Sequence, residues 1–134
     1  MIRCSLLAVG LLPGVLSGAS LAADVKDFDA RWREAEQNVR AGPAQQYFND
    51  VFFKEFFGKY TDHVNACTQR TGEKITSDLK AAVELTATGV VSTVLVRPQT
   101  KAADCFADLV KQDRFSKPPF DHFWVPVEVR FTKP

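Results

Sequence analysis

Two histidines and, apart from Cys4, two cysteines are the residues of this sequence best suited to metal or nucleophilic chemistry. His63 and Cys67 are four residues apart, the spacing that places two metal ligands on one face of a helix. Cys105 and His122 would complete a Cys-Cys-His-His set of the kind that holds zinc. In an oxidising compartment the two cysteines instead form a disulfide, which leaves no thiolate for a metal or for nucleophilic attack. The export signal described below favours the disulfide, so we predict a Cys67–Cys105 bridge and neither metal nor cofactor.

Carboxylates act as general acid or base where they are held in reach of a substrate, in a cleft that shifts their pKa. Four candidates lie late in the chain: Asp104, Asp108, Asp113 and Asp121. The pattern places them on the solvated side of a helix or in a turn, and it forces no pair of them together. The sequence contains neither a glycine-rich phosphate loop nor a nucleophile elbow. We therefore predict no catalytic residues, and a binding or structural protein rather than an enzyme.

The first residues have the pattern of a secretory signal peptide. Arg3 supplies a positive charge, residues 5–16 form an uncharged apolar run, and Ser-Leu-Ala at 20–22 offers small residues to a signal peptidase. Cleavage there makes 1–22 the signal and 23–134 a single domain in the periplasm of a Gram-negative-type cell, with no membrane span left. The alternative is an uncleaved anchor helix, which would need roughly 20 consecutive apolar residues.

Removal of the signal also balances the charge of the chain. The full sequence has 17 Lys and Arg residues and 16 Asp and Glu residues, and the loss of Arg3 leaves 16 of each. A domain without a basic stripe has no electrostatic footprint for phosphate groups, so we exclude nucleic acid as a partner. Cys4 leaves with the signal too, so two cysteines remain to pair in the exported domain.

Two helices open the domain and form a helical part that we place at 23–72. A stripe of apolar residues at three- and four-residue spacing indicates the first helix, which ends at Gly42. The second helix carries "VFFKEFFGKY" at 51–60. At about 100° per residue its aromatic side chains fall on one broad half of the helix and its charged side chains on the other. Such a helix is expected to pack on a sheet, with Phe53 and Phe57 at a margin that a small sheet leaves uncovered.

From residue 79 onward the apolar pattern alternates with a period of two, which is typical of strands. Residues 79–87 and 90–96 are two such segments, and Thr88-Gly89 between them is suited to a tight turn. Thr100 then provides an N-cap for a third helix. We expect a β-hairpin followed by a short helix.

The last segment with this alternation covers residues 123–131 and completes a core that we place at 78–133. Pro126 lies in the middle of the segment, and a proline, which has no backbone N–H, is confined to edge strands and bulges. The order of the elements predicts an α+β domain, with two N-terminal helices packed on a small antiparallel sheet of β-β-α-β order and the helices on one face. The predicted disulfide would tie the second and third helices together over that sheet.

Several marks in the second half of the chain occur together in one known family. They are Gly89-Val90-Val91 at the start of the second strand, a polar turn before a short helix, Phe115 with Pro118 after it, and an alternating last strand. With these marks, residues 79–133 resemble the C-terminal domain of TonB-like proteins and their gliding-motility relatives. The position of Cys105 is similar to that of a cysteine in the gliding-motility branch.

The resemblance implies a periplasmic domain without enzymatic activity, to which a partner adds a short extended segment beside the last strand. In this mode of binding, backbone hydrogen bonds give affinity and alternate side chains give selectivity. Carried over to this chain, the strand edge comprises Phe123, Val125, Val127 and Val129.

We therefore expect a binding module for a periplasmic or membrane-complex protein, which docks through the last strand or through the aromatic residues Phe53 and Phe57. Small size, export and one disulfide fit equally well a periplasmic inhibitor or immunity-type protein that blocks an enzyme. A small hydrolase or a metal-binding protein is a further alternative, which the residue inventory disfavours. The pattern predicts neither the identity of the partner nor the oligomeric state.

Overall fold

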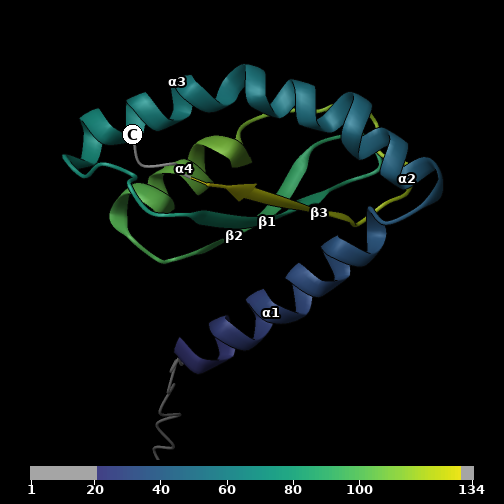
Figure 1. Ribbon diagram of the computed structural model, residues 1–134, viewed down its shortest axis with the longest axis horizontal. Helices are drawn as coiled ribbons and strands as arrows, with labels where there is room; N and C mark the ends of the chain where they lie inside the picture. The colour runs from purple at the N-terminus through teal and green to yellow at the C-terminus, as the bar shows by residue number, and fades with distance from the viewer. Residues whose placement is uncertain (1–20, 131–134) are drawn as a thin grey trace, which may run out of the picture.

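The computed structural model describes residues 21–130 of the chain. The predicted signal peptide lies outside the described residues except for its last two positions, and so does Phe131 of the predicted last strand. The elements are α1 (Leu21–Asn38), α2 (Gly42–Tyr47), the π-helical turn η1 (Phe48–Phe52), α3 (Phe53–Thr71), β1 (Leu79–Leu85), β2 (Val91–Arg97), α4 (Lys101–Lys111) and β3 (Phe123–Val129) (Figure 1). Within 21–130, no helix combines the length and the apolar character that a membrane span requires.

The three strands form one antiparallel sheet in the order β2-β1-β3. β1 pairs with β2, where Ala82 lies opposite Leu95, and it pairs on its other side with β3, where Ala82 lies opposite Pro126. α4 connects β2 to β3. The predicted α+β class and the β-β-α-β order are therefore confirmed, and β3 lies at an edge of the sheet, as Pro126 indicated.

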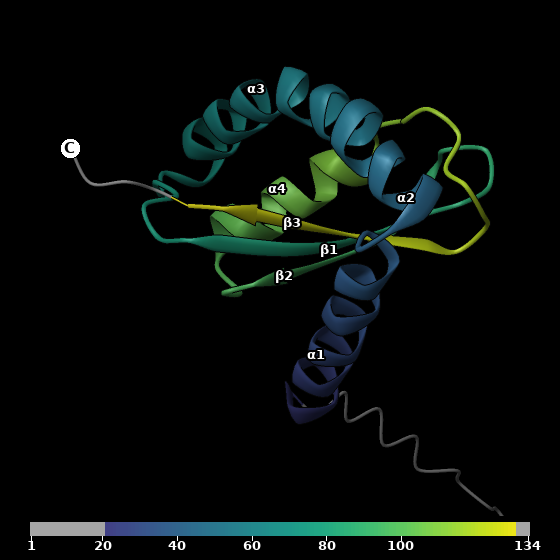
Figure 2. The ribbon, with the colours of Figure 1, turned by 45° about the vertical axis from the view of Figure 1, so that its right-hand side comes forward.

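The helices cover both faces of the sheet (Figures 1 and 2). α3 and α4 lie over one face, and α1 lies against the other. On the α1 side, Ala35 packs with Ala82 and Trp124, and Trp32 and Leu95 surround them. The expectation that the helices share one face was therefore wrong. Ala82 and Trp124 point away from their core-facing neighbours along β1 and β3, so these strands have a second apolar face that needs a cover.

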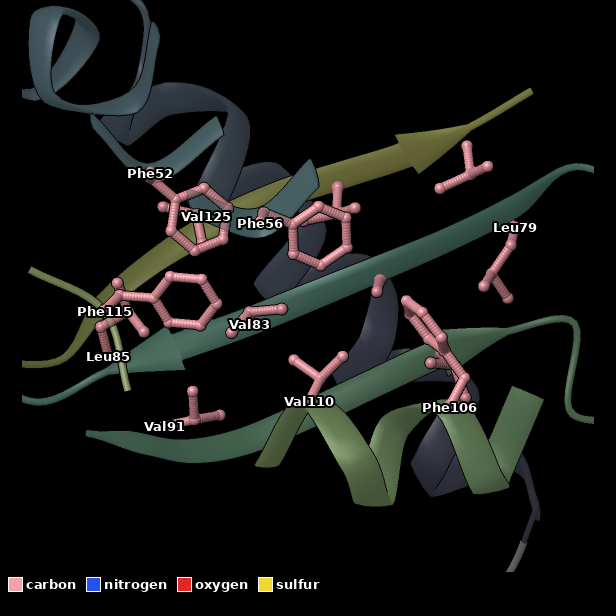
Figure 3. Packing of buried hydrophobic residues seen from close by; sticks show 14 of the residues in the cluster. Phe52, Phe56, Leu79, Val83, Leu85, Val91, Phe106, Val110, Phe115 and Val125 are labelled. Carbon is pink, nitrogen blue, oxygen red and sulfur yellow. The ribbon is translucent and has the colours of Figure 1, made fainter. Parts of the chain in front are cut away.

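The larger core lies between the sheet and the pair α3 and α4 (Figure 3). Cys67 of α3 is bonded to Cys105 of α4, across 38 positions of the sequence. The predicted disulfide is thus present and joins the two helices above the sheet. Among the described residues, the largest fully buried side chains are those of Phe52, Phe106, Phe123, Leu85, Val83, Val110, Val125 and Cys67.

Gly89 holds the hairpin against the segment that follows α4. Its φ is +86°, and a Cβ at this position would lie 1.9 Å from the carbonyl oxygen of Phe115. The backbone N–H of Phe115 donates to the carbonyl of Gly89 at 2.9 Å, and Val90 and Arg114 form an isolated bridge beside it. Only glycine satisfies both the dihedral angle and the close approach.

The ends of the helices follow local sequence signals. Thr100 caps α4 by accepting a hydrogen bond from the N–H of Ala103 at 3.1 Å, as predicted. Gly72 ends α3 in the left-handed conformation, with a φ of 72°. The π-helical turn was not predicted. It joins α2 to α3, so the helical run from Gly42 to Thr71 is continuous, and its extra residue changes the direction of the side chains that follow.

Candidate functional site

The cysteines and histidines do not come together as a metal site. Cys67 and Cys105 are bonded to each other, so neither sulfur is a thiolate. His63 Nε2 lies 2.7 Å from Asp113 Oδ2, and the two side chains bridge α3 to the segment after α4. Among the described residues, no three histidine, cysteine, aspartate or glutamate side chains are grouped in a way that would hold a metal ion.

A polar cluster lies beside the hairpin, around Glu84 of β1. His122 Nδ1 is 3.3 Å from Glu84 Oε2, and the hydroxyl of Ser92 donates to Glu84 Oε1 at 2.6 Å. That hydroxyl is therefore bonded to a carboxylate and not to an imidazole that would activate it. Hydrogen bonds from the backbone N–H groups of Ala87 and His122 hold the pKa of Asp121 below its ordinary value. The cluster fastens the turn before β3 to the hairpin.

A groove of about 240 Å³ lies at the free edge of β3. Its base is β3 at Pro126, Val127 and Glu128, and one wall consists of Trp32 and Glu36 of α1. The opposite wall is formed by the aromatic rings of η1 and α3, which are those of Phe48, Phe52, Phe53, Phe56 and Phe57. The last strand and the aromatic helix, which the sequence offered as two separate binding surfaces, thus border the same groove.

Phe53 and Phe57 form the exposed rim of this groove. They have 47 % and 42 % of their surface exposed, and their ring centroids are 4.4 Å apart. Phe52 and Phe56 are buried in the core between them and the sheet. A sheet of three strands covers only part of the aromatic half of the helix, which is why Phe53 and Phe57 remain partly in water.

The predicted strand residues Phe123, Val125, Val127 and Val129 point into the core. Their side chains have between 0 % and 8 % of their surface exposed and belong to the larger core. Val127 is the one of the four that also lines the groove. The strand therefore presents mainly its backbone at the edge.

The alternation of a strand determines which backbone groups of β3 face the groove. The carbonyl of Trp124 accepts a hydrogen bond from Asn38 Nδ2 of α1 at 3.1 Å, so this carbonyl points away from β1. Pro126 and Glu128 follow at two-residue steps and point the same way. Because proline has no N–H, the open groups among the residues that line the groove are the carbonyl of Pro126 and both backbone groups of Glu128. Asn38 and Pro126 together leave this edge only partly able to pair.

Four residues of the groove were not singled out from the sequence: Trp32, Glu36, Phe48 and Glu128. Trp32 belongs to the apolar stripe of the first helix, which indicated burial but not its neighbours. The packing of α1 on the second face of the sheet brings Trp32 and Glu36 to the edge of β3.

Comparison with known proteins identified no relative of this chain. Neither the models of protein families, nor the curated proteins, nor the solved structures gave a match. The resemblance of residues 79–133 to TonB-like C-terminal domains therefore stays a prediction that rests on the residues named for it. The disulfide is consistent with an oxidising compartment outside the cytoplasm.

Proposed function

We propose that the chain is an exported, non-enzymatic binding protein whose groove beside β3 holds an extended segment of a periplasmic or membrane-complex protein. One observation carries this proposal: the open backbone edge of β3 and the exposed rings of Phe53 and Phe57 border the same groove. A further support is that both sulfurs are joined in a disulfide and the hydroxyl of Ser92 is bonded to Glu84, so these side chains are engaged in structural contacts.

Side chains of the partner supply most of the affinity in this groove. The edge of β3 offers the carbonyl of Pro126 and the backbone of Glu128, because Asn38 already occupies the carbonyl of Trp124. Aromatic side chains bury large areas and dominate the energetics of interfaces. An apolar side chain of the partner that enters between Phe57 and Trp32 therefore contributes more than strand pairing does.

The charges of the groove indicate which segment fits. Glu36 and Glu128 are the charged residues among those that line it, and both are acidic. Glu128 also pairs with Arg130 at 3.1 Å on the exposed side. A lysine or arginine next to the apolar residue of the partner would meet Glu36 and lie over the aromatic rings. We therefore commit to an extended apolar segment of a partner protein with a basic residue beside it.

Site-specific photo-crosslinking in the cells that produce the protein tests this function. p-Benzoylphenylalanine replaces Phe57 in the groove or, as a matched control, Phe120, which has 47 % of its surface exposed and lies outside the groove. We expect one protein to be captured from position 57 and not from position 120. Capture of the same protein from both positions would contradict the proposal.

The captured segment is then synthesised as a peptide, and its affinity is measured by fluorescence anisotropy. Truncation of an aromatic anchor in an interface typically costs at least about 2 kcal/mol, so Phe57→Ser should weaken binding by at least about thirtyfold. Phe120→Ser should leave the affinity within about twofold of the unmodified protein. Equal losses for both variants would rule the groove out. An enzyme as the captured protein would favour the inhibitor role over a membrane complex.

A further inference from the structure

The opposite edge of the sheet, at β2, also borders a hollow, with a volume of about 250 Å³. It lies between α1 on one side and α4 on the other, with β2 as its base. Its lining residues are Asp27, Phe28, Val94, Leu95, Val96, Gln99, Asp104, Ala107 and Asp108. Each edge of the sheet therefore borders a groove, and α1 forms one wall of both grooves.

The backbone of β2 is better equipped to pair than that of β3. Val125 and Val127 of β3 face β1, and their partners Val83 and Ala81 face β3. The alternate residue Ala82 then faces β2, where its partner Leu95 faces back. It follows that the N–H and C=O groups of Val94 and Val96 point away from β1, toward the groove.

No proline interrupts β2, whose sequence is VSTVLVR, so each outward residue keeps its N–H group. An added strand would meet two residues in succession, Val94 and Val96, that offer both a donor and an acceptor. At β3 the corresponding central residue is Pro126, which offers an acceptor alone. Strand addition therefore favours the β2 edge.

The groove beside β2 is acidic on both walls. Asp27, Asp104 and Asp108 line it, and none of its lining residues is basic. Asp104 and Asp108 are exposed, and neither forms an ion pair within the part of the chain that the structure describes. Asp27 Oδ1 lies 3.8 Å from Arg31 Nε, and Arg31 also pairs with Glu34. A groove lined by charges of one sign concentrates the opposite charge.

The spacing of the two carboxylates on α4 matches that of side chains along a strand. Asp104 and Asp108 are four residues apart on α4, about 6 Å along the helix axis. Residues on one face of a strand repeat at about 6.7 Å. Because Val94, Val96 and these two aspartates line the same groove, two basic residues of an added strand, separated by one residue, would meet both carboxylates.

We propose that the β2 edge binds an extended, lysine- or arginine-bearing segment of a partner protein by strand addition. The backbone of that segment pairs with Val94 and Val96, and alternate basic side chains reach Asp104 and Asp108. A second copy of this chain does not fit, because edge-to-edge pairing at β2 would bring two sets of carboxylates together. This site is separate from the groove beside β3 and does not depend on the function proposed for it.

A peptide-binding measurement tests the proposal. A labelled peptide of alternating lysine and valine is titrated with the protein, whose disulfide is kept intact. We expect binding that weakens as the salt concentration rises, and an affinity at least about tenfold higher than that of the glutamate–valine peptide. Asp104→Asn combined with Asp108→Asn should weaken binding by about tenfold. A matched control, Asp50→Asn with Asp62→Asn on exposed positions of η1 and α3, should leave it within about twofold.

NMR spectroscopy locates the peptide. In ¹⁵N spectra we expect the amides of Val94 and Val96 to shift more, and at lower peptide concentration, than those of Glu128 and Phe57. Shifts confined to β3 and α3, equal affinity for the two peptides, or equal losses in the two double variants would each overturn the proposal. Absence of binding would overturn it as well and would leave the aspartates as protection of the edge against self-association.

Discussion

The two faces of the sheet are held by different kinds of contact. Between the sheet and the pair α3 and α4 lie fully buried apolar side chains and a disulfide. Between the sheet and α1 the buried cluster is small, and cations lie over rings across the interface. These pairs are Arg31 over Trp124 at 5.2 Å, Lys80 over Trp32 at 5.0 Å and Arg97 over Phe28 at 4.4 Å. One face should therefore provide most of the stability, and the other should position α1, which forms a wall of both grooves.

The largest effect is expected in the α3 and α4 core. Phe106 has none of its surface exposed, and its ring contacts those of Phe56 and Tyr60. Phe106→Ala should lower the free energy of unfolding by about 3–5 kcal/mol, because it removes a buried ring and leaves a cavity. Urea denaturation followed by circular dichroism measures this. Phe120→Ala, at an exposed ring, should change it by less than about 1 kcal/mol, and similar losses at both positions would contradict the comparison.

Reduction of the disulfide should have the next largest effect. The Cys67–Cys105 bond closes a loop of 38 positions, and removal of such a link costs about 2–4 kcal/mol, in the chain-entropy account through the freedom that the unfolded chain regains. Urea denaturation with and without dithiothreitol measures this difference. The double variant Cys67→Ala with Cys105→Ala serves as a control that should not respond to the reductant. If the unmodified protein were equally stable with and without the reductant, the disulfide would not stabilise the packing of α3 and α4 on the sheet.

A smaller effect is expected on the α1 face. Arg97 pairs with Asp29 at 2.8 Å, where both side chains are nearly half exposed to water, and it lies over the buried ring of Phe28. Arg97→Met should lower stability by about 1 kcal/mol, and the difference should shrink as salt is added. Arg40→Met, at an exposed position, is the matched control and should change stability by less than about 0.5 kcal/mol.

Tryptophan fluorescence reports on the contact between α1 and the sheet. The chain has two tryptophans, and both Trp32 and Trp124 lie between α1 and the sheet. Movement of α1 away from the sheet should change their emission before the circular dichroism of the core changes. Arg97→Met should separate the two transitions further. Coincident transitions in that variant would show that α1 is as firmly held as α3.

Much of the fold could be predicted from the sequence because its signals are local. The alternation of the strands, the cap at Thr100 and the turn at Gly89 each depend on a few neighbouring residues. The edge position of β3 could be predicted from Pro126 alone, since a proline there would interrupt a central strand. The disulfide followed from the number of cysteines together with the expected compartment.

The arrangement of the helices could not be predicted in the same way. The apolar stripe of the first helix shows that Phe28 and Trp32 need a partner surface, but it does not say which face of the sheet provides it. Ala82 and Trp124 were the available signal, because they make the outer positions of β1 and β3 apolar. Both grooves depend on that placement of α1, so neither could be assembled from the sequence.

The smallest effect, and one of opposite sign, is expected at Tyr60 on the α3 side. Its hydroxyl is buried and has no hydrogen-bond partner among the described residues. Tyr60→Phe removes this unsatisfied group and should leave stability unchanged or raise it by up to about 1 kcal/mol. Urea denaturation at neutral pH measures the change, and a loss larger than about 1 kcal/mol would show that the hydroxyl has a partner.

The alkaline side of the pH range sharpens this test. Burial raises the pKa of Tyr60 above its ordinary value of 10.0. The unfolded chain therefore releases this proton at a lower pH than the folded chain, so the unmodified protein loses stability as the pH rises above 10. Tyr60→Phe should lose less over the same range, so its advantage should grow with pH. A constant difference in stability between the two proteins from pH 7 to pH 11 would mean that water reaches the phenol of Tyr60. The core between α3 and the sheet would then be open to solvent at this point.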